Sequence, residues 1–247
     1  MAKFKSTRLV KITYAAIAFG VIVLGVLVAS DDGLSRTEIA LAAVSTVFST
    51  FLGATFAYRL QQYRDDQSRR AERVAALNRG LFVLIQQLNA LVQIAGPFKR
   101  LASIEQRAFG VDPYRPPDYS RLRQDLDSLN FLIECGQPQA LLELAVEDDR
   151  FFQALVSVEI RTTHLVPLIE RIHMEGLEGR TLTRQAMDAA LGELNVRTML
   201  AMTVHVCTNV FGSLDSLPTM FDKLRGAAKA IYPAESFLKM ESKTESN

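Results

Sequence analysis

The chain of 247 residues contains no tryptophan, two cysteines and three histidines. Cys135 and Cys207 are too far apart to form a metal-binding pair, and two cysteines make no disulfide framework, so the chain suits a reducing compartment. The sequence also lacks the phosphate-binding loop, the dinucleotide-binding glycine motif, the serine nucleophile elbow and the zinc-protease motif. We therefore expect a protein that is not an enzyme and that holds no cofactor and no metal.

The histidines support the same expectation. His164 and His173 are nine residues apart, so they point to opposite sides of a helix and cannot share a metal. Glu170 and His173 have the Glu-x-x-His spacing of half a di-iron site, but the sequence has no second such pair. His205 lies on an apolar stretch, where we expect a boundary or core residue rather than a ligand.

Charge is missing from two long segments, although charged residues make up 22% of the chain. Residues 12–30 and 39–58 are uncharged and mostly apolar. As helices they span about 29 and 30 Å, the thickness of the hydrocarbon core of a bilayer. Backbone polar groups must be satisfied internally in lipid, and the connecting loop 31–38 is short. The sequence therefore predicts a two-helix transmembrane hairpin in a lipid bilayer.

Basic residues lie outside this hairpin on both sides. Four of them occur in residues 1–11, and five arginines follow the second span, whereas loop 31–38 holds Arg36 beside three acidic residues. The positive-inside rule then places both termini in the cytoplasm and the loop outside, in an integral protein of a bacterial inner membrane. The alternative is a signal peptide cleaved near Ser30, although the apolar run is longer than is usual there.

The second span has small residues at every fourth position, and the first span has a pair at the same spacing. Such a stripe lets helix backbones approach closely. It packs either within the hairpin or between hairpins, and the second reading predicts a homo-oligomer with hydroxyl groups along a seam or narrow pore. The residues that we predict to pack transmembrane helices are Ala16, Gly20, Ser45, Ser49, Gly53 and Ala57.

The arginines after the second span have two interpretations. They either bind the head groups of anionic lipids or only determine the topology. They are Arg59, Arg64, Arg69, Arg70 and Arg73.

Residues 59–233 have apolar side chains at helical spacing and no convincing alternation of period two. We predict that the second span continues as a helix to Gly96, and that further helices end near Gly136, Gly176 and Pro233. The predicted fold is all-α: the transmembrane hairpin and then a cytoplasmic antiparallel helical bundle at 59–233, with a flexible tail at 234–247.

Some polar residues in the bundle invite an interpretation. Asn78 and Asn89 lie in an apolar helical stretch and are candidates for buried residues that set the packing register. The acidic run 147–149 follows Pro138, and we interpret it as complementing a helix dipole at a helix start. Basic and acidic residues are nearly balanced after residue 58, which argues against a nucleic-acid partner.

Two functions follow from this layout. The first is a membrane-anchored interaction or sensor module that self-associates through its hairpin and binds a cytoplasmic protein through its bundle. The second is an effector that permeabilises the membrane when its bundle is triggered. In layout, a hairpin at 12–58 and then a helical domain, the chain resembles the two-span membrane effectors of bacterial anti-phage systems of the retron and abortive-infection type. That resemblance implies a partner encoded nearby and a toxic output at the inner membrane.

Overall fold

The computed structural model describes residues 34–176 and 184–240. The predicted cytoplasmic segment 1–11 and the first predicted span lie outside the described residues. The chain divides into two compact units, Met1–Arg69 and Arg70–Asn247. This boundary falls eleven residues later than the start of the bundle that we predicted at residue 59.

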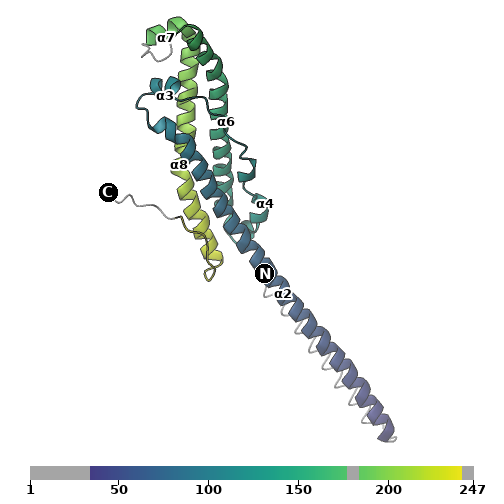
Figure 1. The fold of residues 1–247 in the computed structure, drawn as a ribbon. Helices are drawn as coiled ribbons and strands as arrows, with labels where there is room; N and C mark the ends of the chain where they lie inside the picture. The colour runs from purple at the N-terminus through teal and green to yellow at the C-terminus, as the bar shows by residue number, and fades with distance from the viewer. Residues whose placement is uncertain (1–33, 177–183, 241–247) are drawn as a thin grey trace. The chain divides into compact units, whose positions relative to one another are not determined.

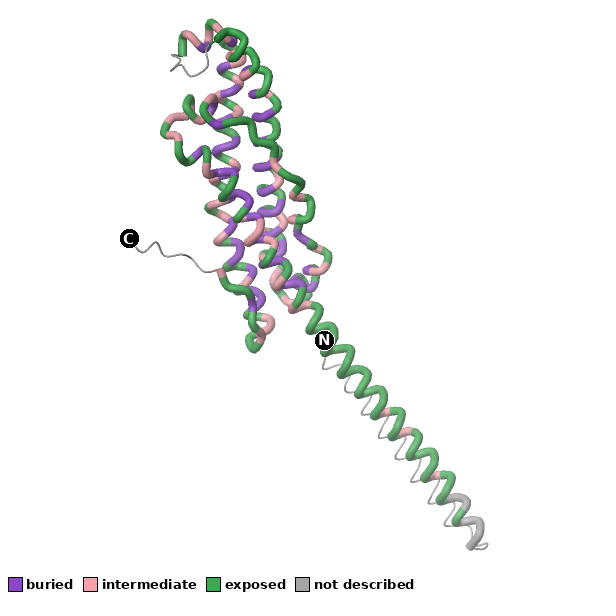
Figure 2. Tube along the Cα trace, viewed as in Figure 1, coloured by how far each residue is buried: buried purple, intermediate pink, exposed green. Residues whose placement is uncertain are grey.

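In the first unit, the described residues belong to helix α2 (Leu34–Lys99), which continues into the second unit. The helix begins at Leu34, inside the predicted loop. It contains an 18-residue window with a mean hydropathy of 1.5, none of which is buried in the protein. Figure 2 shows this part of α2 as exposed almost throughout. Among the described residues, this is one helix long and apolar enough to cross a membrane, and the two-helix hairpin itself is not observed.

The threonines of this stretch are satisfied by their own helix. The Oγ1 hydroxyls of Thr46, Thr50 and Thr55 each donate a hydrogen bond of 2.8 Å to the carbonyl oxygen four residues earlier. This bond pairs the hydroxyl without water. The threonines are therefore compatible with an apolar surrounding and do not require an aqueous pore.

The second unit is a bundle of three long helices, namely the rest of α2, α6 (Pro138–Met174) and α8 (Glu193–Ile231) (Figure 1). The described residues contain no β-strand. The all-α prediction is confirmed for them, as is the prediction of a helical bundle. Short helices connect the long ones: α3 (Ile104–Gly110), η1 (Ser120–Leu122), α4 (Leu126–Leu129), α5 (Phe131–Glu134) and α7 (Arg184–Leu191).

The long helices do not all alternate in direction. Gln87 of α2 bonds to Asp148 of α6, and Phe98 of α2 lies 5.2 Å from the Arg161 guanidinium of α6, so α2 and α6 run parallel. Helix α8 is antiparallel to α6, which it contacts extensively. Our prediction of an antiparallel bundle was therefore wrong for the α2–α6 pair. The reason is the connection, because residues 111–137 return along the bundle in short pieces instead of one helix.

Leucines fill the centre of the bundle. Leu77, Leu81, Leu84 and Leu91 of α2 are fully buried and pack with residues of α6 and α8 in one hydrophobic cluster. Figure 2 shows buried residues along the inner sides of these helices. The predicted apolar spacing of α2 therefore does identify its core-facing side.

Two predicted helix ends are confirmed by glycines in the left-handed conformation. Gly136 has φ 76° before α6, and Gly176 has φ 64° after it. Glycine adopts this backbone geometry without steric cost, so it stops a helix. Between these glycines α6 is one helix, whereas we had predicted two. Upstream we had predicted one helix ending near Gly136, and the structure instead has α4 and α5, which are separated at Asn130. The Asp125 side chain accepts from the Ser128 amide and so caps the start of α4.

Packing at the end of the chain extends past residue 233, where we had placed the tail. Phe237 is buried, and the Leu238 amide donates to the Asn78 side chain of α2 at 3.2 Å. Glu235 forms an ion pair of 2.8 Å with Arg70. Residues 234–240 therefore belong to the packed bundle, and residues 241–247 lie outside the described part.

A buried arginine holds the α3 segment against α6 and α8. The side chain of Arg161 is 1% exposed, and its Nη2 group donates to the carbonyl oxygens of Arg107, Ala108 and Val111 at 2.9–3.0 Å. Its Nε donates to the Thr203 hydroxyl of α8 at 3.4 Å. Burial lowers the pKa of Arg161 to about 10, which leaves the group charged at neutral pH. The carbonyl dipoles at the end of α3 partly offset the cost of burying this charge.

Replacing this arginine should destabilise the bundle. We predict that Arg161→Met lowers the free energy of unfolding by about 3 kcal/mol, because three buried carbonyl oxygens lose their donor. Urea unfolding of the full chain in detergent, followed by circular dichroism, measures this. The matched control is Arg79→Met, an exposed arginine of α2 that makes no ion pair or hydrogen bond with the described residues, and this change should cost under about 1 kcal/mol. Equal losses in the two variants would contradict the role given to Arg161.

Candidate functional site

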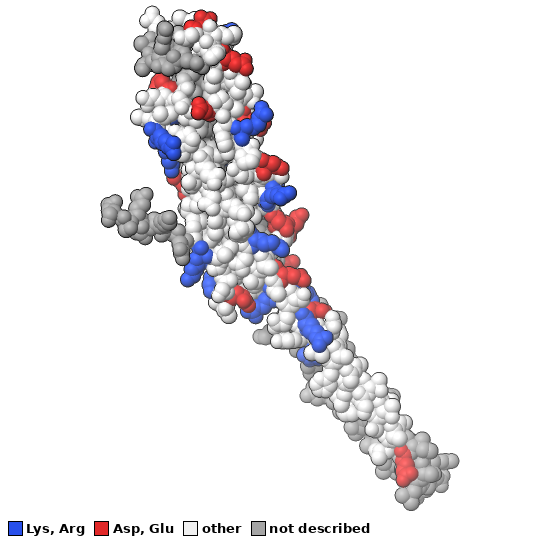
Figure 3. Space-filling model, in the orientation of Figure 1, with Lys and Arg blue, Asp and Glu red and all other residues white. Residues whose placement is uncertain are grey.

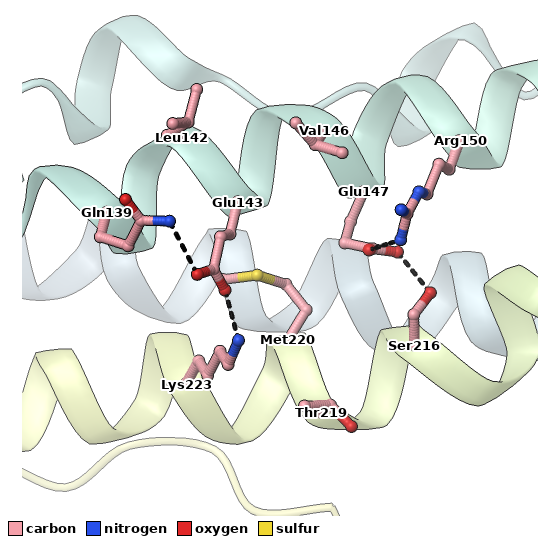
Figure 4. Close-up of a pocket in the computed structure, with 10 residues that line it drawn as sticks. All are labelled: Gln139, Leu142, Glu143, Val146, Glu147, Arg150, Ser216, Thr219, Met220 and Lys223. Atoms are coloured by element: carbon pink, nitrogen blue, oxygen red, sulfur yellow. Dashed lines mark hydrogen bonds and ion pairs between the residues drawn. The ribbon is translucent and has the colours of Figure 1, made fainter.

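A groove between α6 and α8 is lined mainly by polar and charged side chains (Figure 4). Its volume is about 410 Å³. Leu142 and Val146 stand on the α6 side, and Met220 forms part of the α8 side. The remaining lining residues are Gln139, Glu143, Glu147, Arg150, Ser216, Thr219 and Lys223.

Each oxygen of the two groove carboxylates, Glu143 and Glu147, accepts one hydrogen bond from the protein. Glu143 accepts from Lys223 at 2.6 Å and from Gln139 at 3.0 Å. Glu147 accepts from Arg150 and from Ser216, each at 2.6 Å. The bond from Lys223 lowers the pKa of Glu143, so this carboxyl is ionised at neutral pH.

Contacts within this groove join the two helices. The Lys223–Glu143 ion pair and the Ser216–Glu147 hydrogen bond connect α8 to α6 in antiparallel register. The Arg150–Glu147 pair lies within α6. The groove is therefore a surface shared by two helices that are fixed relative to each other.

An apolar stripe runs along α6 beside this groove. Leu142, Val146, Val156 and Ile160 are exposed, and Leu142 keeps 59% of its surface accessible. Their spacings of four, ten and four residues place them on one face of the helix. The exposed Asp149 and Gln153 lie between the two aliphatic pairs on the same face. Exposed aliphatic pairs on one face of a helix are the kind of surface on which a second helix packs. We call these four residues the α6 stripe.

A second polar cluster lies inside the bundle, where the return segment, residues 111–137, meets α2 and α6. The Gln87 Nε2 group donates to Asp148 Oδ1 and to the Leu122 carbonyl oxygen, each at 2.8 Å. The Gln124 amide donates to the same Asp148 oxygen at 3.1 Å, and its side chain donates to the Gly80 carbonyl at 3.2 Å. Asp148 is 2% exposed. The cluster therefore fastens the return segment between the two parallel helices.

The energetic cost of this cluster is the burial of the Asp148 carboxyl group. Burial raises the pKa of its carboxyl, and the bonds from Gln124 and Gln87 offset part of that rise. Arg123 approaches only to 4.0 Å and also faces Asp149. Our interpretation of residues 147–149 as a helix-start cluster was therefore wrong, because they lie well inside α6 and two of them are buried.

We did not predict this cluster from the sequence, and we proposed Asn78 and Asn89 as buried amides in place of Gln87. Gln87 is fully buried, whereas Asn89 is exposed and Asn78 is only half-buried. Leu88 also satisfied the apolar spacing of α2, so it concealed the polar residue beside it. The available signal was the glutamine itself, since it lies in register with Leu84 and Leu91.

The predicted transmembrane stripe is exposed wherever it is described. Ser45, Ser49, Gly53 and Ala57 are all exposed on α2. A methyl group added to Gly53 would meet no atom within 4 Å, so nothing in the described chain requires glycine there. Ala16 and Gly20 lie outside the described residues.

The predicted arginines separate into two groups. Arg69 pairs with Asp66 at 3.7 Å, Arg70 with Glu235 at 2.8 Å, and Arg73 with Glu134 at 3.0 Å. Arg59 and Arg64 are exposed and make no ion pair or hydrogen bond with the part of the chain that is described.

The histidines and cysteines form no cluster. His205 is exposed beside Asn209, contrary to our expectation of a boundary or core residue. Cys207 is buried as expected, and burial raises the pKa of its thiol. Within the described ranges, no group of three or more metal-ligating side chains is found.

No protein-family model matches the chain, and neither a curated protein nor a solved structure gives a significant match. The function must therefore be argued from the molecule's own geometry.

Asp148 gives a testable dependence of stability on pH. A carboxyl whose pKa is higher in the folded state binds its proton more readily when folded, so it favours folding as the pH falls. We predict that the contribution of Asp148 to stability rises as the pH falls through its raised folded pKa and on toward its unfolded pKa. The ordinary unfolded value is about 3.9.

Asp148→Asn should remove this pH dependence. At pH 7 the variant should be at least as stable as the wild type, because its Oδ1 still accepts from Gln87 and Gln124 without a buried charge. Asp148→Ala should lose about 1–3 kcal/mol, since it leaves these donors unpaired. Urea midpoints at pH 5 and pH 7 measure these differences. A loss of stability in Asp148→Asn that is larger at pH 7 than at pH 5 would contradict the assignment.

Proposed function

We propose that the chain is a membrane-anchored interaction module without enzymatic activity, which self-associates through its membrane segment and binds a cytoplasmic protein through its bundle. The observation that carries this proposal is helix α2. One part of it is an 18-residue apolar window with nothing buried, and another part lies in a bundle with its own core. An apolar helix surface of this length is stable in lipid and costly in water.

The proposed orientation keeps the bundle in the cytoplasm. Arginines follow the apolar window of α2, and the positive-inside rule assigns that side to the cytoplasm. The visible face in Figure 3 is uncharged along much of the described first unit and has basic and acidic groups interspersed over the bundle. On this face the mixed charges suit contact with aqueous solution and form no basic patch for nucleic acid.

The α6 stripe is the surface that we assign to the cytoplasmic partner. Its occupant in this proposal is the apolar side of a partner helix, which would pack against Leu142, Val146, Val156 and Ile160. The neighbouring groove supports binding by a fixed surface, because the Lys223–Glu143 ion pair and the Ser216–Glu147 hydrogen bond join α6 to α8.

A photo-crosslinking amino acid introduced at Leu142 tests this assignment. In the native host it should yield one discrete crosslinked protein, and Val156→Asp should reduce that product at least fivefold by placing a charge within the interface. Position Arg79 on the exposed side of α2 is the matched control. Products of equal intensity at both positions, or none at Leu142, would refute the α6 stripe as the interface.

Self-association through the membrane segment has its own test. Gly53→Leu should lower the affinity of the dimer in vesicles by about tenfold, because a bulky side chain separates closely packed helices. Energy transfer between labelled chains measures this affinity. A Cβ atom added at Gly53 meets no atom of the described chain within 4 Å, so the described residues leave space for a side chain there. The neighbouring Ala54→Leu lies off the stripe and should have little effect. Unchanged energy transfer in Gly53→Leu would count against the stripe.

The same pair of variants separates the module from the membrane effector. Rapid loss of membrane potential on expression of the wild type, absent with Gly53→Leu at equal abundance, would favour the effector. An unchanged potential is the result that we expect, because the described threonine hydroxyls are already paired within their helix.

A further inference from the structure

The turns of α2 that follow its apolar stretch present two arginines and two tyrosines. Arg59, Arg64, Tyr58 and Tyr63 are all exposed. We propose that Arg59 and Arg64 bind the phosphates of anionic lipids, and that Arg69, Arg70 and Arg73 serve other contacts. This inference rests on the proposed membrane anchor and names the lipid chemistry that the anchor recognises.

The pairing of the arginines is the first argument. Arg70 is held by Glu235 and lies 5.8 Å from the Tyr232 ring, and Arg73 is held by Glu134 and lies 5.0 Å from the Phe131 ring. These two guanidiniums already serve as contacts within the bundle. Arg69 has a weaker partner, since its 3.7 Å pair with Asp66 is well exposed.

Local carboxylates do not neutralise the other two arginines. Asp65 accepts a hydrogen bond of 2.9 Å from Gln61, and Asp66 faces Arg69. Arg59 and Arg64 have no such contact within residues 34–176 and 184–240. They are therefore the two arginines of this region that keep their full donor capacity for a ligand.

The positions of Arg59 and Arg64 along the axis of α2 are the second argument. The uncharged stretch ends at Tyr58, so Arg59 and Arg64 follow it by about 1.5 and 9 Å along the helix axis. The head-group layer of a bilayer is roughly 5–8 Å thick on each side, and an arginine side chain extends this reach. Arg69 begins about 16 Å from Tyr58 along the axis, beyond that layer.

The chemistry of the side chains agrees with this height. A guanidinium presents a planar fork of donors that matches the oxygens of a phosphate, and it stays charged at all physiological pH values. Tyrosine is enriched at the membrane interface because its ring is apolar and its hydroxyl is polar. The four residues therefore combine phosphate recognition with interfacial anchoring.

The absence of tryptophan makes a direct experiment possible. Tyr58→Trp places a single fluorophore next to Arg59, at the end of the apolar stretch, where acyl chains can contact it. The full chain carrying this change is reconstituted in vesicles of phosphatidylglycerol and phosphatidylcholine in equal amounts. Either lipid is supplied with brominated acyl chains, which quench tryptophan on contact, and the ratio of quenching gives the relative affinity for the anionic lipid.

We expect a preference for phosphatidylglycerol of about fivefold or more, given the attraction of an arginine to an anionic surface. In the background of Arg59→Gln with Arg64→Gln the preference should fall to about one, and Arg59→Lys with Arg64→Lys should restore part of it. Arg69→Gln with Arg70→Gln removes the same charge and should keep the preference.

Two results would overturn the inference. Equal quenching by both lipids, or an equal loss of preference in the two glutamine pairs, would mean that Arg59 and Arg64 have no specific role while the anchor stands. Quenching by neither lipid would place residue 58 away from any bilayer, and the proposed anchor would then fail together with the inference.

Discussion

Helix α2 must satisfy two different surroundings, and the other features of the molecule depend on that requirement. Between Leu41 and Tyr58 it is apolar and uncharged, and almost all of this surface is exposed. From Ala76 onward it is apolar on one side, and that side is buried among the leucines of the bundle. Burial of apolar surface is the dominant favourable term in folding. The second part gains it from its own chain, and the first part requires lipid or other helices.

The bundle depends in turn on a chain reversal that contains little regular structure. Because α2 and α6 run parallel, residues 111–137 must return along both helices. Two buried polar groups hold this return path, one at its start and one near its middle. Arg161 binds the carbonyls around the end of α3, and Asp148 binds Gln87 and Gln124. Each buries polarity at a cost, and each pairs backbone groups that no helix or sheet would otherwise satisfy.

Periodicity predicted the long elements of this fold well and the connections poorly. The stripe from Leu77 to Leu91 identified the core side of α2, and Gly136 and Gly176 marked the ends of helices. The parallel pair was missed, because helical spacing says nothing about the direction of neighbouring helices. Gln87 was missed for a related reason, since the spacing accepted Leu88 equally well and only packing selects between two adjacent residues.

The candidate site was predictable in part. The five arginines after the second span are visible in the sequence, but their division into paired and unpaired groups depends on Glu134 and Glu235, which are distant in the chain. The α6 stripe was also hidden, because Leu142 and Val146 resemble core residues until the buried face of α6 is known. Exposure of an aliphatic side chain is a property of the folded helix and not of its local sequence.

The central claim is that α2 crosses a membrane with the bundle on the cytoplasmic side. Cysteine labelling tests it directly. Two variants, Glu38→Cys and Gln67→Cys, are each combined with Cys135→Ser and expressed in bacteria. Spheroplasts prepared from these cells are treated with a membrane-impermeant maleimide. Cys207 is buried and should stay unreactive. The account predicts that Glu38→Cys reacts in intact spheroplasts and that Gln67→Cys reacts only after lysis. Labelling of Gln67→Cys in intact spheroplasts, or recovery of the protein in the soluble fraction, would contradict it.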